Sequence, residues 1–388
     1  MRNLLKIELN PKRVYGLDIL RALAILFVVV EHGRFLLPHR LEFIHQFVIF
    51  DGVSIFFVLS GFLIGGILIK IFEERGSSNR ILLDFWIRRW FRTLPNYFLI
   101  LIILGTLSVL FTEDFSFYQI RRYFIFSQNL FSEHPEFFPE AWSLSIEEWY
   151  YLLIPISIFL LIRVFNHTPS RSVLYTAVGI LFIITIFRFY RSMNVEISNY
   201  EEWDLWYRKQ VFTRLDSLMF GMIGAYIQYH FKEKWLRHKK VLLFTGIALF
   251  VLWKFGAMSN FFPIDGLYSC VFSFSITSMA TLALLPYLSS LKYGQGKLYT
   301  FFTYISLISY SMYLINLTLI QTWIIDSIHW SLLSENIYLI IFVKYGLFWS
   351  LTITVSILIY KYFEVPVMNL RDHKIFTRRK DKLKKGRQ

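Results

Sequence analysis

Residues 52–69, GVSIFFVLSGFLIGGILI, contain no Asp, Glu, Lys or Arg over 18 positions. Three more stretches of this kind lie at 93–112, 266–291 and 298–325 and contain 20, 26 and 28 residues. Their lengths suit the roughly 20 apolar residues with which an α-helix crosses the hydrocarbon core of a bilayer. Lipid offers no partner for free backbone groups, so runs of this length cross as helices. The sequence therefore predicts an all-α polytopic membrane protein.

Apolar runs between charge clusters predict about ten transmembrane helices. They lie at about 16–36, 47–70, 94–112, 149–166, 173–190, 211–230, 241–258, 267–290, 302–325 and 338–362. With a cytoplasmic N-terminus, the segments between these helices place 29 Lys and Arg residues inside and 9 outside. Basic residues favour the cytoplasmic side of a membrane, so this asymmetry predicts that both termini are cytoplasmic.

The composition limits the classes of partner. The chain has 388 residues, is 55% hydrophobic and carries a formal net charge of +14. Half of that charge lies in residues 371–388, which we interpret as a basic cytoplasmic tail drawn to anionic lipid. We therefore predict no nucleic-acid partner. Cys270 is the only cysteine and no His-Glu-x-x-His motif occurs, so we predict neither a metal site nor a permanently bound cofactor.

Ionisable groups inside a membrane span are expensive and are candidates for function. Arg21 and His32, in the first span, are 11 residues apart, which is three helical turns plus about 20°. Both side chains therefore project from one face, about 16 Å apart along the helix axis. Asp18 lies on the same face and is a candidate ion partner of Arg21. The alternative is that Arg21 snorkels to the inner interface and His32 caps the outer end.

Two arginines precede the third span on the cytoplasmic side. Arg89 and Arg92 are three residues apart and can share a helical face. Each guanidinium offers a planar fork of donors, which suits a ligand that bears phosphates. The alternative is an ordinary basic anchor, with Trp86 and Trp90 in the interfacial belt.

The remaining polar positions lie near or within later spans. Glu147 and Glu148, in the segment WSLSIEE (142–148), either stabilise the start of the fourth span, or one of the two carboxylates enters a cavity near His32, at the same depth. Arg214 and Asp216 are two residues apart, so they point to nearly opposite sides of a helix. Tyr310 and Asn316 are typical of hydrogen bonds between membrane helices.

These residues lie in motifs that recur together in one known family. The segments are YGLDILRALA (15–24) with His32, FFVLSGFL (56–63), RWFRTLP (89–95), WSLSIEE (142–148), RLD (214–216) with Gly221, SYSMYL (309–314) and EVP (364–366). In this order they resemble the acyltransferase 3 family of integral membrane acyltransferases. The match covers residues 14–366, which we interpret as one membrane domain.

The resemblance implies a multi-pass enzyme of the bacterial inner membrane. It would transfer an acyl group, most often acetyl, from acyl-coenzyme A to a hydroxyl of a cell-surface carbohydrate or glycolipid, such as lipopolysaccharide. Its partners would be the lipid bilayer, acetyl-CoA as donor substrate and the glycan acceptor. By motif, Arg21 and His32 match the family's Arg-x10-His pair, Arg89 and Arg92 its donor-binding Arg-x-x-Arg motif, and Glu147 its essential acidic position.

Three positions depart from the family pattern. Ser54 stands where an Asp commonly precedes the Phe pair, and Asp51 lies three residues earlier. Asn316 replaces a frequent His in the ninth span, and Trp149 replaces a Gln that often follows the paired Glu. The departures at Ser54 and Asn316 put the family roles of those positions in doubt.

The motif matches lead to a mechanistic hypothesis. Coenzyme A phosphates bind Arg89 and Arg92, and the pantetheine arm follows a polar path lined by Arg21. His32 acts as general base on the acceptor hydroxyl, because an imidazole suits proton transfer at neutral pH, and Glu147 orients His32 or stabilises its charged form. Direct transfer and a covalent acyl-His relay both stay open. The rival interpretation is a transporter or flippase of a glycolipid or polysaccharide precursor, although the internal repeats of many transporters do not stand out here.

Overall fold

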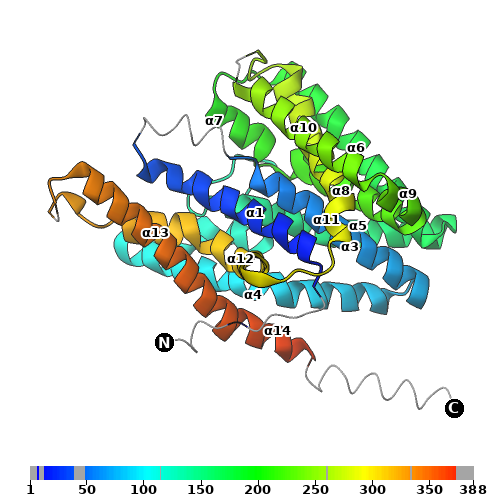
Figure 1. The fold of residues 1–388 in the computed structure, drawn as a ribbon, viewed down its shortest axis with the longest axis horizontal. Coiled ribbons are helices and arrows are strands. Elements are labelled where there is room, and N and C mark those ends of the chain that lie inside the picture. The colour runs from blue at the N-terminus through cyan, green and yellow to red at the C-terminus, as the bar shows by residue number, and fades with distance from the viewer. Residues whose placement is uncertain are drawn as a thin grey trace.

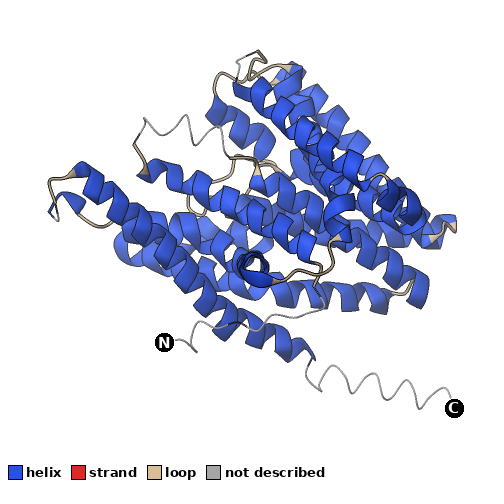
Figure 2. Ribbon diagram, viewed as in Figure 1, coloured by secondary structure: helices blue, strands red, loops and turns tan. Residues whose placement is uncertain are grey.

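The computed structural model describes residues 7, 13–38, 49–113, 115–258, 261–332 and 334–372. Within these ranges the chain forms helices joined by turns and loops, and contains no strand (Figure 2). The predicted all-α fold is confirmed. The predicted basic tail lies outside the described residues from position 373 onward.

Long helices build the bundle, and short helical segments connect or extend them. The long helices are α1 (Tyr15–Gly33), α3 (Gly52–Arg75), α4 (Asn79–Phe111), α5 (Ala141–Phe165), α6 (Pro169–Asn194), α8 (Val211–His230), α10 (Lys239–Met258), α11 (Ser273–Ser290), α12 (Gly296–Ile315) and α13 (Ile337–Ile359). The short segments are η1 (Arg34–Leu36), η3 (Phe117–Ile125), α7 (Tyr200–Trp203), η4 (Asp204–Arg208), α9 (Lys232–Arg237), η5 (Tyr268–Phe272), η6 (Asn316–Ile325), η7 (Trp330–Leu332), η8 (Tyr360–Glu364) and α14 (Val365–Asp372).

Seven helical segments of the described chain are long and apolar enough to cross a membrane. They are α3, α4, α5 and α6, then η5 with α11, α12 with η6, and α13 with its extensions η8 and α14. The other three predicted spans correspond to α1, α8 and α10, which have 19, 20 and 20 residues. The multi-pass helical architecture is therefore as predicted, whereas the total of about ten crossings and the cytoplasmic termini stay predictions.

Helix α1 lies at the centre of the bundle. It packs against α3, α11 and α12, and Figure 1 shows α13 on one side of it and α6 and α10 on the other. Its first turn approaches α11 closely because Gly16 has no side chain: a Cβ there would lie 2.0 Å from the carbonyl oxygen of Leu288. A similar contact joins α3 to α8, where a Cβ on Gly61 would lie 1.9 Å from the carbonyl oxygen of Leu218. Small residues let membrane helices meet backbone to backbone, and here they fix the helices around α1.

Helix α12 continues beyond Ile315 as a π-helix, η6, that begins at Asn316. Glu140, just before α5, holds this transition, because its carboxylate accepts hydrogen bonds from the Thr318 hydroxyl and, at 2.7 Å, from the Thr318 N–H. Burial raises the pKa of Glu140 to about 7, although these hydrogen bonds act in the opposite direction. π-helical turns are rare and frequently occur at functional sites. The start of η6 is therefore a candidate position for chemistry.

Candidate active site

A carboxylate and three arginines meet between α1, α3, α4 and α5. Glu147 of α5 accepts hydrogen bonds from the Ser60 hydroxyl of α3 at 3.1 Å and from the Tyr151 hydroxyl at 2.9 Å. Three guanidinium groups, one from α1 and two from α4, are close enough for charge interaction with this carboxylate. They belong to Arg21, Arg89 and Arg92, and together with Glu147 they form what we call the Arg21 cluster. The structure thus brings together four of the five site residues predicted from the sequence.

The arginines of this cluster are not neutralised by direct ion pairs. Among the described residues, none of the three has a carboxylate oxygen within 4.0 Å. Asp18, predicted as the ion partner of Arg21, instead accepts a hydrogen bond from Arg13 Nε at 2.9 Å and another from the Ser306 hydroxyl at 2.8 Å. Arg13 precedes α1 and reaches back onto its first turn, so this carboxylate is already occupied. The predicted ion pair of Asp18 with Arg21 does not form, because Asp18 pairs with Arg13, although the charges of Asp18, Arg92 and Glu147 all act on Arg21.

The position of Tyr151, which donates to Glu147, depends on a proline. Pro155 lies four residues further along α5 and has no N–H, so the Tyr151 carbonyl lacks its usual helical partner. The indole N–H of Trp86 in α4 donates to that carbonyl at 2.9 Å. Trp86 therefore does more than anchor the interface, because it ties α4, which carries two arginines of the cluster, to α5.

Two further carboxylates flank the Arg21 cluster. Glu148 accepts a hydrogen bond from the Thr93 hydroxyl at 2.7 Å. Glu364 of η8 accepts hydrogen bonds from Asn96 Nδ2 at 2.8 Å and from the Ser311 hydroxyl at 3.1 Å. Charges of the cluster act on both carboxylates. Glu148 was predicted either to stabilise the start of the helix or to enter a cavity near His32. No role was predicted for Glu364, although a carboxylate at the edge of an apolar run was a signal for it.

His32 lies further along α1 and has different surroundings. Its Nδ1 is 2.6 Å from Oδ1 of Asn316, the first residue of η6. The basic side chains of Arg34, Arg208 and Lys209 are near enough for their charges to act on the ring. The imidazole is half-buried. We call this group the His32 cluster; its five members are His32, Arg34, Arg208, Lys209 and Asn316.

The Arg21 and His32 clusters are distinct sites on one helix. The 11 residues between Arg21 and His32 correspond to about 16 Å along the axis. In the described chain no hydrogen bond or ion pair joins Glu147 to His32, and the ring's hydrogen-bond partner is Asn316. The expectation that Glu147 orients His32 directly therefore differs from the structure. Glu147 and His32 were predicted at the same depth in the membrane, but depth alone does not determine the side of α5 from which the Glu147 carboxylate projects.

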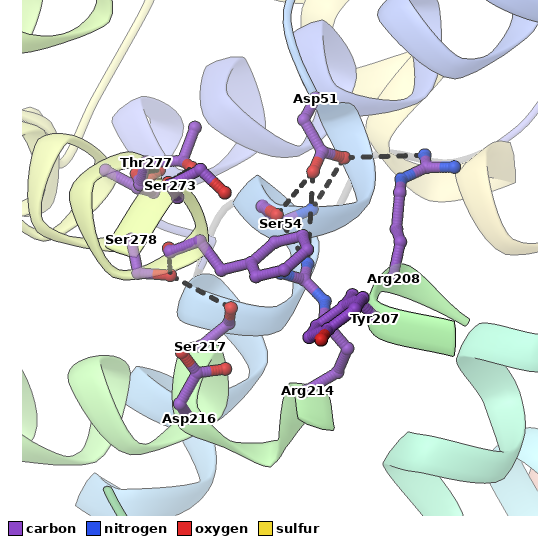
Figure 3. A network of polar contacts seen from close by, with 12 residues as sticks. Asp51, Ser54, Tyr207, Arg208, Arg214, Asp216, Ser217, Ser273, Thr277 and Ser278 are labelled. Atoms are coloured by element: carbon purple, nitrogen blue, oxygen red, sulfur yellow. Dashed lines mark hydrogen bonds and ion pairs between the residues drawn. The ribbon is translucent and has the colours of Figure 1, made fainter. Parts of the chain in front are cut away.

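A third polar network lies where α3, η4 and α8 meet (Figure 3). Asp51 caps α3 by accepting a hydrogen bond from the Ser54 N–H at 3.2 Å. It also lies 3.8 Å from a guanidinium nitrogen of Arg208 and 3.9 Å from one of Arg214, and Arg214 donates to the Ser54 hydroxyl at 2.6 Å. The Ser54 hydroxyl also donates a hydrogen bond to the Asp51 carboxylate, so Ser54 contacts both Asp51 and Arg214.

The two charged residues of the sixth predicted span join different contacts. Asp216 forms an ion pair with Arg188 of α6 at 2.8 Å, and both side chains are 0% exposed. Arg214 instead contacts Asp51 and Ser54 (Figure 3). The two residues thus have different direct partners, and both partner arrangements include a guanidinium over the Phe274 ring, that of Arg188 at 5.3 Å and that of Arg214 at 4.1 Å.

The helical bundle, with ionisable groups along one face of its central helix, defines the class of multi-pass helical membrane proteins with a polar interior. This chain belongs to the acyltransferase 3 family, whose model, described as an acyltransferase domain, matches residues 14–361. The resemblance found in the sequence motifs is confirmed.

Two relatives show how far the similarity extends. A Staphylococcus aureus (strain COL) protein provisionally named an O-acetyltransferase is 30% identical over 240 residues, which are 56% of this chain and 35% of that protein. O-acetyltransferase OatA of Staphylococcus aureus (strain NCTC 8325 / PS 47) is 27% identical over 300 residues, which are 70% of this chain and 44% of that protein. The chain thus spans less than half the length of these curated relatives. No solved structure matches the chain.

Proposed function

We propose that this protein is a membrane O-acyltransferase that moves an acyl group, most often acetyl, from acyl-coenzyme A to a hydroxyl of a cell-surface carbohydrate or glycolipid. The proposal places it in the bacterial inner membrane. The observation that carries the proposal is the division of α1 into two sites: cations without direct ion pairs around Arg21, and a hydrogen-bonded imidazole at His32. The names of the O-acetyltransferase relatives support the same reaction class.

The Arg21 cluster is the proposed donor site. Guanidinium groups bind phosphate oxygens through paired, charge-assisted hydrogen bonds, and neither Arg89 nor Arg92 has a carboxylate oxygen within 4.0 Å among the described residues. They would hold the phosphates of the donor. Arg21 would line the path of the pantetheine arm toward His32. Glu147, held by Ser60 and Tyr151, would keep the arginines together between turnovers.

The His32 cluster is the proposed site of acyl transfer. His32 takes the proton of the acceptor hydroxyl as its oxygen attacks the thioester carbonyl. The tetrahedral intermediate then collapses, the carbon–sulfur bond breaks, and the imidazolium returns the proton to the thiolate of coenzyme A. In the covalent route, the ring first takes the acyl group from the thioester and coenzyme A leaves as its thiol. The acceptor hydroxyl then attacks acyl-His32, and the ring leaves as the free imidazole. Both routes need a half-buried ring that a substrate can reach.

A radiolabel assay tests the proposal. Purified full-length protein in liposomes is given acetyl-labelled acetyl-CoA and a glycan acceptor, and base-labile label on the glycan is counted. We expect transfer by the wild type, a loss of about 100-fold or more in His32→Ala, and wild-type transfer in the matched surface variant His230→Ala. Near-full activity of a well-folded His32→Ala protein would remove His32 from the mechanism. A transporter or flippase would leave the glycan unlabelled.

A further inference from the structure

We propose that Asn316 is the positioning residue of the reaction: its side-chain oxygen holds the proton of His32 on Nδ1 and leaves Nε2 as the nitrogen that accepts the acceptor's proton. This inference deepens the proposed function and rests on His32 being the base. It is carried by the hydrogen-bond geometry around one buried amide at the start of η6.

The orientation of the Asn316 amide follows from its neighbours. Asn316 is 0% exposed, so each of its polar atoms needs a partner within the protein. Its Nδ2 lies 2.8 Å from the carbonyl oxygen of Met312 and 3.0 Å from that of Tyr313. A flipped amide would place its own oxygen against these two carbonyl oxygens. None of the three oxygens carries a proton, so no hydrogen bond could form between them. The nitrogen therefore faces the carbonyls, and Oδ1 faces His32 at 2.6 Å.

This orientation decides the tautomer of the ring. An amide oxygen can only accept a hydrogen bond, so Nδ1 of His32 must be the donor. A neutral imidazole with its proton on Nδ1 carries its lone pair on Nε2. The same division of labour operates in hydrolytic triads, where a group hydrogen-bonded to one ring nitrogen fixes the other as the base. Asn316 would perform this task without a negative charge.

The backbone around Asn316 holds the amide in place. The two carbonyls that Nδ2 binds lie at the end of α12, where the change from α-helix to π-helix begins. On the far side of Asn316, Glu140 accepts hydrogen bonds from the N–H and the hydroxyl of Thr318. The Tyr313 hydroxyl donates to the Glu140 carbonyl at 2.9 Å. Asn316 is therefore fixed from both sides, with its oxygen directed at α1.

The charged side chains near His32 are cations, whereas its hydrogen-bond partner Asn316 is neutral. Arg34 follows α1, and Arg208 and Lys209 lie at the end of η4, and all three act on the ring as cations. Asn316, a neutral amide, leaves the charge of these cations unchanged. A carboxylate at position 316 would counteract them.

Three variants of the full-length protein in liposomes test the inference. Asn316→Leu removes the acceptor with a side chain of similar size, and Asn316→Asp keeps an acceptor oxygen but adds a negative charge. Gln321→Leu is the matched control, because Gln321 is a buried amide of the same π-helix whose Oε1 has no hydrogen-bond partner. The readouts are kcat, KM for acetyl-CoA and the pH dependence of kcat.

We expect Asn316→Leu to lower kcat about 10- to 100-fold while KM for acetyl-CoA stays unchanged, since part of the contribution of a positioned base is lost. In Asn316→Asp the acid limb of the pH profile should move upward by about one pH unit, because the new carboxylate stabilises the protonated ring. Gln321→Leu should keep the wild-type profile. A merely structural role of Asn316 would lower kcat without moving the acid limb in Asn316→Asp.

A spectroscopic measurement gives a readout besides activity. In protein labelled with nitrogen-15 histidine, the signals lost in His32→Ala identify the ring. We expect a protonated Nδ1 and an unprotonated Nε2, and a mixture of tautomers in Asn316→Leu. A protonated Nε2 in the wild type, or wild-type kcat in Asn316→Leu, would overturn the inference while an inactive His32→Ala leaves the proposed function standing. Activity of His32→Ala would instead overturn both.

Discussion

The two ends of α1 handle charge in opposite ways. Around Arg21, three guanidinium groups lie near the carboxylates of Glu147, Glu148 and Glu364, yet none is ion-paired within 4.0 Å among the described residues. Around His32, the nearby cations are paired: Arg208 lies 2.9 Å from Asp204, and Lys209 lies 2.6 Å from the same carboxylate. These two cations also hold the pKa of Asp204 below its ordinary value, although burial acts to raise it.

This contrast indicates which end receives a charged ligand. Arg21 and Arg89 are half-buried and Arg92 is exposed, and none of the three has a carboxylate oxygen within 4.0 Å among the described residues. Guanidinium groups without a direct ion pair can form charge-assisted hydrogen bonds to an added anion, so the Arg21 end suits the binding of an anionic ligand. At the His32 end the cations are ion-paired and the imidazole is hydrogen-bonded, which suits proton transfer from a neutral hydroxyl to the ring. One helix therefore connects a site for binding with a site for chemistry.

The largest effect on stability is expected where a buried cation is paired. Asp216→Ala leaves Arg188 unpaired in the interior and should lower the free energy of unfolding by about 3–5 kcal/mol. Glu147→Gln, in contrast, should leave stability nearly unchanged, because the arginines around it are not ion-paired. Unfolding of both variants in a detergent titration checks this. Equal destabilisation of the two would contradict the contrast between paired and unpaired arginines.

A smaller effect is expected on donor binding. Replacing both Arg89 and Arg92 by Ala should raise KM for acyl-CoA about 10- to 100-fold, the range of one or two charge-assisted hydrogen bonds, with a smaller change in kcat. Arg88→Ala is the matched control, since Arg88 is the exposed neighbour of Arg89. An unchanged KM in the double variant would remove these arginines from the donor site.

A still smaller effect is expected from the link between α4 and α5. Trp86→Phe removes the donor to the Tyr151 carbonyl, and the buried acceptor left behind should lower stability by about 1 kcal/mol. The effect should be confined to the Arg21 end, so KM for acyl-CoA rises and the pH profile of kcat is unmoved. Trp253→Phe, in α10, serves as control. A shifted pH profile in Trp86→Phe would show that the two ends are not independent.

The smallest effect concerns the pH dependence of stability. The pKa of Glu140 is raised by burial from its ordinary 4.5 to about 7, so the native state binds this proton more readily than the unfolded state. Its contribution to stability is then fully present below pH 4.5 and is lost as the pH rises to about 7. Glu140→Gln cannot titrate. Its melting temperature should therefore rise relative to that of the wild type between pH 4.5 and 7, and a constant difference would contradict the raised pKa.

Helical periodicity predicted the relations that depend on one helix alone. Arg214 and Asp216 are two residues apart on α8 and, as that spacing led us to expect, they have different direct partners, Asp51 for Arg214 and Arg188 for Asp216. The all-α fold followed from the length of the uncharged runs. These inferences succeeded because a helix fixes both the rise and the rotation between its own residues.

Relations between helices could not be predicted in this way. Asp18 pairs with Arg13, which lies outside the helical repeat, and not with Arg21. Asn316 meets His32 across 284 residues of sequence, and its orientation depends on a π-helix that hydrophobic periodicity does not reveal. The depth of Glu147 gave no information on the direction in which its side chain projects. The packing of one helix on another decides these contacts.

We propose that the donor enters at the Arg21 end and the acceptor at the His32 end, on opposite faces of the membrane. Sealed proteoliposomes of one orientation test this, with labelled acetyl-CoA on one face and a membrane-impermeant glycan on the other. We expect labelled glycan when donor and acceptor are separated by the bilayer, and no labelled glycan in His32→Ala vesicles. Transfer that requires both substrates on the same face would contradict it.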